Sequence, residues 1–151
     1  DAVCRLEHKP MCFFDDKYFP IATNVYSPFN SQNTLFSREA LKKYLVMPGI
    51  GRMDDIWSSY YLEACGFNVV YTKATVFQDR NVQDLTKNLK EEFIGYEKTL
   101  DLLKHFNYKQ RDDMPFGIPK NTYSPEDAYK KFLPDSTIKV MESYLNITKH
   151  I

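Results

Sequence analysis

The chain has 151 residues, of which 43% are hydrophobic and 15% aromatic, and its 20 basic residues balance its 20 acidic residues. This length is typical of one domain, and the composition is too apolar for a disordered segment. Because the chain lacks the basic excess on which phosphate binding relies, we expect no nucleic-acid partner. No apolar run is long enough to span a bilayer, so we expect no membrane segment in this chain.

Residues 1–80 are predicted to mix short strands with helices. Ser37 is a suitable N-cap for a helix over residues 38–45, and Pro48, Gly49 and Gly51 then break the chain. Segments rich in β-branched and aromatic residues predict extended structure at residues 3–6, 11–14, 18–25, 68–71 and 75–77.

A second helix is predicted to begin at Asp54 or Asp55, because apolar residues then repeat at helical spacing. These residues are Ile56, Trp57, Tyr60, Tyr61 and Ala64. Gly66 fits the position just beyond the end of this helix, where a residue with positive φ is common.

The rest of the chain is predicted to be helical. A long helix over residues 84–106 should cover the sheet with an apolar face. The residues of that face are Leu85, Leu89, Phe93, Tyr96, Leu100 and Leu103. Ser124–Pro125 is typical of a helix start, and Pro134–Asp135 ends that helix and begins the last one.

These elements predict an α/β fold. Residues 1–106 would form a short mixed sheet with covering helices, and residues 107–151 would form a helical C-terminal extension packed on it.

Four polar residues, Asn30, Ser31, Gln32 and Asn33, lie between two apolar pairs. Amide side chains both donate and accept hydrogen bonds, so they suit sugar hydroxyls and phosphate oxygens. The alternative is a polar loop whose side chains bond to its own backbone.

A second polar group is the pair Asp54–Asp55, which follows Arg52 and precedes Trp57, the only tryptophan. Acids at a helix N-terminus satisfy free N–H groups and favour the helix dipole. Alternatively, one carboxylate caps the helix while the other points into a cleft as a general base. Trp57 would then either offer its face to a sugar ring or anchor the core.

Asp15 and Asp16 end an apolar segment and could present carboxylates to Mg²⁺ or Mn²⁺, but a tight turn at Lys17 explains them equally well. The three histidines and three cysteines show no metal-ligand spacing. We therefore assign no metal site within this chain.

The order of these pieces resembles the acceptor-side segment of glycosyltransferases with the GT-A fold. Residues 27–40 have the sequence SPFNSQNTLFSREA, in which a small polar loop leads to an Arg-Glu-Ala helix start. The acidic motif at residues 54–55 follows, and then GFNVVY at residues 66–71, which is similar to a Gly-aromatic-x-Val-Val-Tyr strand.

Within that fold the chain resembles the STELLO-type glycosyltransferases and, more distantly, the reversibly glycosylated polypeptides, which include UDP-arabinopyranose mutases. Both carry an Arg-x-x-Asp-(Ile/Met)-Trp element, which Arg52, Asp55, Ile56 and Trp57 match. The resemblance covers residues 1–105 and implies the C-terminal half of a catalytic domain, because such folds carry their nucleotide-binding strands and DxD motif upstream. The chain also begins with Asp1 rather than Met, so we expect a piece of a longer protein.

The resemblance implies transfer of a sugar from a nucleotide-sugar donor to a hydroxyl acceptor. Asp55 would be the base, with Asp54 as second choice, and Arg52 would assist the leaving diphosphate. The sugar pocket would be lined by Trp57 and by Asn30, Ser31, Gln32 and Asn33. A divalent metal, Mg²⁺ or Mn²⁺, would be held mainly by residues outside this chain, in the upstream half of the domain. STELLO-type proteins are Golgi membrane proteins, which implies the Golgi lumen as the location.

Two other interpretations stay open. The chain could be a non-catalytic sugar- or protein-binding module derived from the same fold. It could also be an unrelated small α/β interaction domain in which Asp54 and Asp55 only cap a helix.

Overall fold

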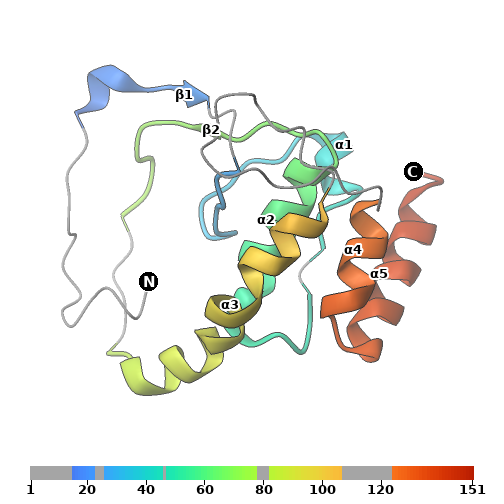
Figure 1. Cartoon of the computed structure of the whole chain (residues 1–151). Coiled ribbons are helices and arrows are strands. Elements are labelled where there is room, and N and C mark those ends of the chain that lie inside the picture. Colours follow the sequence, from blue (N-terminus) through green and yellow to red (C-terminus); the bar gives the residue numbers. More distant parts are fainter. Residues whose placement is uncertain (1–14, 23–25, 46, 78–81, 107–123) are drawn as a thin grey trace.

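The computed structural model describes residues 15–22, 26–45, 47–77, 82–106 and 124–151 (Figure 1). The predicted extended segments at residues 3–6 and 11–14 lie outside these ranges, as does the connection over residues 107–123.

The described residues form a mixed α/β structure that is mostly helical, which confirms the predicted class. In chain order the elements are η1 (Asp16–Tyr18), β1 (Ile21–Ala22), α1 (Arg38–Leu41), η2 (Gly51–Met53), α2 (Asp54–Ala64), β2 (Val70–Tyr71), α3 (Leu85–His105), α4 (Pro125–Phe132) and α5 (Asp135–Thr148). β1 and β2 pair antiparallel, with Ile21 opposite Tyr71 and Ala22 opposite Val70. In the described part of the chain the sheet is therefore antiparallel rather than mixed, and residues 75–77 form no strand.

Two of the predicted helix starts are confirmed by serine caps. The side chain of Ser37 accepts a hydrogen bond from the Ala40 N–H, and Ser124 accepts one from Asp127. Helix α1 ends earlier than predicted, because the N–H groups of Lys43 and Tyr44 both donate to the Ala40 carbonyl and turn the chain out of the helix.

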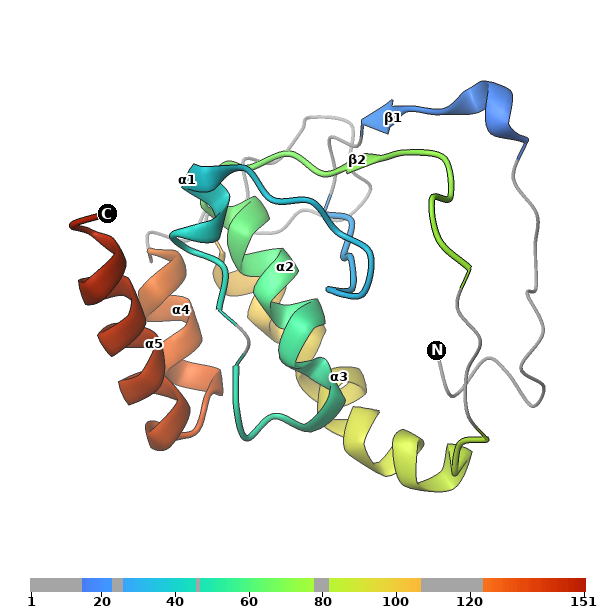
Figure 2. The same ribbon diagram turned by 180° about the vertical axis from the view of Figure 1, so that it is seen from behind.

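The largest buried cluster joins α2, α3, α4 and α5. Its largest side chains are Trp57 and Tyr61 from α2, Phe106 from the end of α3, and Tyr129 from α4. In both views α4 and α5 lie side by side, on the opposite side of α2 from the two strands (Figures 1 and 2). The C-terminal helices thus share one core with α2 and α3.

Helix α3 buries a different face from the predicted one. Four residues of the predicted apolar stripe are between 39% and 62% exposed: Leu89, Phe93, Tyr96 and Leu100. The buried positions in α3 are Glu92, Gly95 and Leu102. The buried face is thus turned by about one residue, roughly 100°. The helix packs on η2 and α4, so the prediction that it covers the sheet was wrong.

Close backbone contact with η2 explains this orientation. A Cβ atom at Gly51 would lie 2.5 Å from the Glu91 carbonyl oxygen, and one at Gly95 would lie 2.4 Å from Met53 Sδ. Glycines at both positions therefore let η2 and α3 approach more closely than side chains would allow. The lack of a side chain at Gly95 thus determines which face of α3 points inward.

We expect Gly51→Ala to lower the free energy of unfolding by about 2–4 kcal/mol, because a methyl group there meets a backbone oxygen and the residue has positive φ. Denaturant unfolding followed by circular dichroism measures the loss.

Gly66→Ala is the matched control, since Gly66 also has positive φ but no atom lies within 4 Å of an added Cβ. It should cost only the backbone strain, about 1–2 kcal/mol. Equal losses of unfolding free energy in Gly51→Ala and Gly66→Ala would show that the close contact between η2 and α3 does not contribute to stability.

Candidate functional site

The amide-rich loop is held against α2 by a ladder of three polar side chains. The N–H of Ser27 donates to Glu63, with distances of 3.1 and 2.9 Å to its two oxygens. The N–H of Phe29 donates to Ser59 Oγ at 3.2 Å, and that of Ser31 donates to Asp55 Oδ2 at 3.0 Å. Alternate residues of the loop segment thus bind every fourth residue of α2, in antiparallel order. We call Asp55, Ser59 and Glu63 the α2 ladder.

The ladder brings the two polar groups predicted from the sequence to one place. Asn30, Gln32, Arg52 and Asp55 all line one cavity of about 500 Å³, which we call the Asp55 cavity. Its opposite wall comes from α3.

The other two loop residues do not line the Asp55 cavity. Ser31 binds Asp55 through its N–H, and its hydroxyl lies 3.5 Å from Asp55 Oδ2. The amide of Asn33 donates to Thr75 Oγ1 at 3.1 Å. Both residues therefore hold the loop in place.

The two adjacent acids have different surroundings. Asp54 Oδ1 accepts the N–H of Asp55 at 2.8 Å, and Asp54 does not line the Asp55 cavity. Asp55 lines it and uses Oδ2 for Ser31. Within the described part of the chain Oδ1 of Asp55 has no hydrogen-bond partner, so this oxygen can receive a proton.

Arg52 pairs with α3 rather than with the two aspartates. Its Nε donates to Glu92 Oε1 at 3.0 Å, and the Glu92 side chain is buried. No described residue binds the terminal nitrogens of Arg52, so they can donate to an anion in the Asp55 cavity.

Trp57 is fully buried, so the prediction that it lines a sugar pocket was wrong. Its Nε1 donates a hydrogen bond to Thr99 Oγ1 at 2.9 Å, and its main-chain carbonyl accepts a hydrogen bond from the Tyr129 hydroxyl group. The indole binds α2 to α3, the main-chain carbonyl of Trp57 binds α2 to α4, and the buried indole exposes no ring face to a ligand. It has the alternative role of a core anchor.

Asp15 caps η1 and binds Lys17, with 2.8 Å between Oδ2 and Nζ, so this segment is a turn. No group of three or more His, Cys, Asp or Glu residues lies together within the described ranges. The metal implied by the resemblance is therefore not assigned to the described residues.

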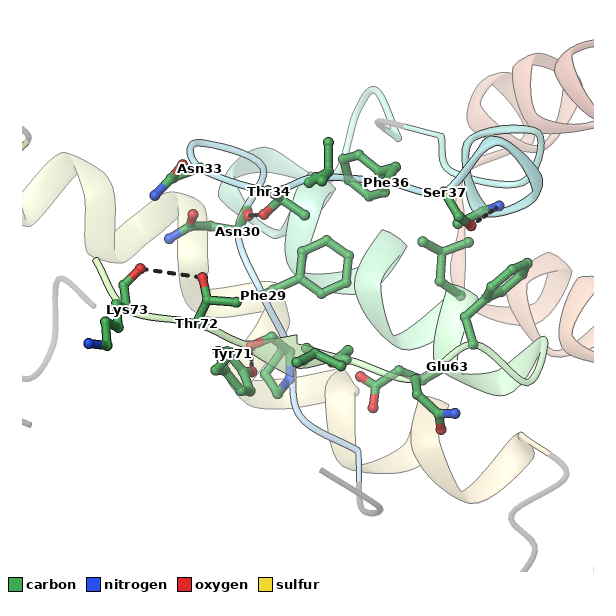
Figure 3. A pocket seen from close by; sticks show the side chains of 18 of the residues that line it. Phe29, Asn30, Asn33, Thr34, Phe36, Ser37, Glu63, Tyr71, Thr72 and Lys73 are labelled. Atoms are coloured by element: carbon green, nitrogen blue, oxygen red, sulfur yellow. Dashed lines mark hydrogen bonds between the residues drawn. The ribbon is translucent and has the colours of Figure 1, made fainter. Parts of the chain in front are cut away.

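A second cavity lies on the other side of the loop, and sequence reasoning missed it. It has a volume of about 610 Å³ and lies between residues 28–37 and residues 67–74 (Figure 3). We call it the Phe29 cavity. Pro28 and Asn30 line both cavities, so this part of the loop is a wall between them.

Glu63 of the α2 ladder lines the Phe29 cavity and is half-buried. Burial raises the pKa of its carboxyl group from the ordinary value of 4.5 to about 7, against the opposing effect of the Ser27 N–H. A sequence signal did exist: a carboxylate in the last turn of a helix opposes the helix dipole, so its presence there called for an explanation.

The chain matches no protein-family model, no curated protein and no solved structure. Within the described ranges, no helix is both long and apolar enough to cross a bilayer. The function must therefore be argued from the geometry of the two cavities.

The raised pKa of Glu63 predicts a pH-dependent stability. Between about pH 4.5 and 7 the folded chain holds a proton that the unfolded chain has lost, so stability falls as pH rises through this range. The shift would amount to about 3 kcal/mol for a fully buried group, and partial exposure reduces it to about 1–2 kcal/mol.

Glu63→Gln should remove this part of the pH dependence, because the amide oxygen still accepts the Ser27 N–H without a charge. Unfolding free energies at several pH values measure the difference from wild type. The exposed Glu97→Gln is the control and should leave the slope unchanged. If the unfolding free energy of Glu63→Gln fell with pH as steeply as that of the wild type, the pH dependence could not be assigned to Glu63.

Proposed function

We propose that this chain is the acceptor-side half of a GT-A-type glycosyltransferase and that Asp55 is the general base for sugar transfer. One juxtaposition supports the proposal: loop amides, an arginine and an accessible carboxylate, from separate segments, line the Asp55 cavity. Its volume of about 500 Å³ lies within the range of small-molecule sites, roughly 300–1,000 Å³.

In this proposal Asp55 accepts the proton of an acceptor hydroxyl as the oxygen attacks the anomeric carbon of the donor sugar. The bond from that carbon to the nucleotide diphosphate breaks, and the diphosphate leaves with the electron pair. Ser31 orients the carboxylate through Oδ2, which leaves Oδ1 for the proton. A base held in this way contributes about 10²–10⁴ in rate.

Arg52 and the loop amides would bind the parts of the two substrates that Asp55 does not contact. The terminal nitrogens of Arg52 would donate to the leaving diphosphate, while Asn30 and Gln32 would bind sugar hydroxyls. The resemblance implies that the nucleotide and the divalent metal bind to the upstream half of the domain, and it implies the Golgi lumen as the location. No step above passes through the metal.

A non-catalytic sugar-binding module is the second candidate. The bond from Ser31 to Asp55 favours it, because a carboxylate in the first turn of a helix that accepts a main-chain N–H also has a purely structural use. The cavity would then bind a sugar without proton transfer.

The variant Asp55→Asn tests the proposal. The Asn side-chain oxygen keeps the hydrogen bond from Ser31 but cannot take a proton, so the transfer rate should fall by about 10²–10⁴. The measurement is transfer by the full-length protein from a panel of nucleotide sugars, with Mg²⁺ or Mn²⁺ present.

Asp54→Asn is the matched control, since Asp54 binds only its own helix N-terminus and does not line the cavity. It should keep most of the wild-type rate. A normal transfer rate in Asp55→Asn would exclude Asp55 as the general base. A drop in melting temperature large enough to account for the lost activity would favour a structural role for Asp55.

A further inference from the structure

We propose that the Phe29 cavity is a second sugar subsite, which takes a neutral sugar unit of an oligosaccharide whose neighbouring unit occupies the Asp55 cavity. This inference rests on the proposed function for what the Asp55 cavity holds.

The floor of the cavity is aromatic. Phe29 and Phe36 both line it, and their ring centroids lie 5.7 Å apart in an edge-to-face arrangement. Tyr44 lies behind them and is buried, with its centroid 4.3 Å from that of Phe36. These contacts fix the two phenylalanine rings, which stay partly accessible. Aromatic ring faces carry negative charge and attract polarised C–H bonds, such as those on one face of a sugar ring.

The rim of the cavity is polar. Asn68 lines it, is exposed and has no hydrogen-bond partner in the described part of the chain. The Asn30 side-chain oxygen accepts the Gln32 N–H, and no described residue accepts a hydrogen bond from its amide nitrogen, which can donate to a ligand. The Glu63 carboxylate shares a single N–H donor between its two oxygens and so has room for ligand hydroxyls. A purely apolar ligand would leave these groups unpaired.

The charges around the cavity favour a neutral ligand. Glu63 and Lys73 are the charged residues of the lining, and they lie at opposite ends of the cavity, with Phe29 between them (Figure 3). Above about pH 7, where Glu63 is ionised, their charges have opposite signs, so the lining carries no excess of one sign. A cation would gain from Glu63 and lose from Lys73, and an anion the reverse, whereas hydroxyl groups can bond to both.

The shared wall connects this cavity to the Asp55 cavity. Pro28 and Asn30 line both, and the α2 ladder fixes the main chain on either side of them. One amide side chain thus borders two sugar-sized spaces. A chain of two or more sugar units that crosses this wall would fill both at once.

The test is a nuclear magnetic resonance titration of the 151-residue chain. The probes are gluco-, galacto- and manno-configured trisaccharides, each compared with the methyl glycoside of its single sugar unit. One trisaccharide should bind about tenfold more tightly than its methyl glycoside, because the second subsite adds to the first. The amide resonances of Asn30 and Asn68 should shift with the trisaccharide.

Ala74→Trp is the blocking variant, since Ala74 is exposed and lines the Phe29 cavity. It should bring the trisaccharide affinity down to that of the methyl glycoside. Lys87→Trp, at an exposed position on α3 that lines neither cavity, is the control and should change neither affinity.

The inference is overturned if no trisaccharide binds more tightly than its glycoside, or if Ala74→Trp leaves the difference in place. Either result leaves the rate loss in Asp55→Asn untouched, so failure of the second subsite is distinct from failure of the proposed function. A normal transfer rate in Asp55→Asn together with trisaccharide binding would instead leave a binding module with two subsites.

Discussion

The α2 ladder is the constraint on which both cavities depend. Asp55, Ser59 and Glu63 are spaced four residues apart along a helix, which is about 6 Å at 1.5 Å per residue. Their N–H donors are spaced two residues apart along an extended segment, which is about 6.6 Å. The two repeats match closely enough for three successive hydrogen bonds. A segment with no strand partner therefore obtains its main-chain bonds from helix side chains.

This arrangement makes the loop segment a partition. Its ladder side faces α2, and the Tyr71 hydroxyl also binds it, donating to the Ser27 and Pro28 carbonyls at 3.2 and 3.0 Å. At its far end Asn33 bonds to Thr75. Because these ties lie at both ends, the residues between them are held apart from β2 and from α3, with a cavity on each side. The amide-rich sequence thus fixes the loop and also lines the two cavities.

Local signals in the sequence were enough to predict where several helices begin, but they were not enough to predict which helix faces are buried. Ser37, Asp84 and Ser124 mark their helix starts by capping chemistry that acts within three or four residues. The inward face of α3 depends instead on Gly95 meeting η2, which no hydrophobic period records. Trp57 was ambiguous for the same reason, since an aromatic residue beside an acidic motif suits either a core or a ligand until its burial is known.

The convergence of the loop with Asp55 was expected from the order of the motifs, but the ladder that produces it was not. A polar side chain at every fourth position of a helix is usually taken as a solvated stripe, and only an extended neighbour of matching spacing turns it into a binding edge. The two ends of this edge are electrostatically unequal. Asp55 lies where the helix dipole favours a negative charge, and Glu63 lies where the dipole opposes one. At the Glu63 end a neutral group keeps the same bond at less cost.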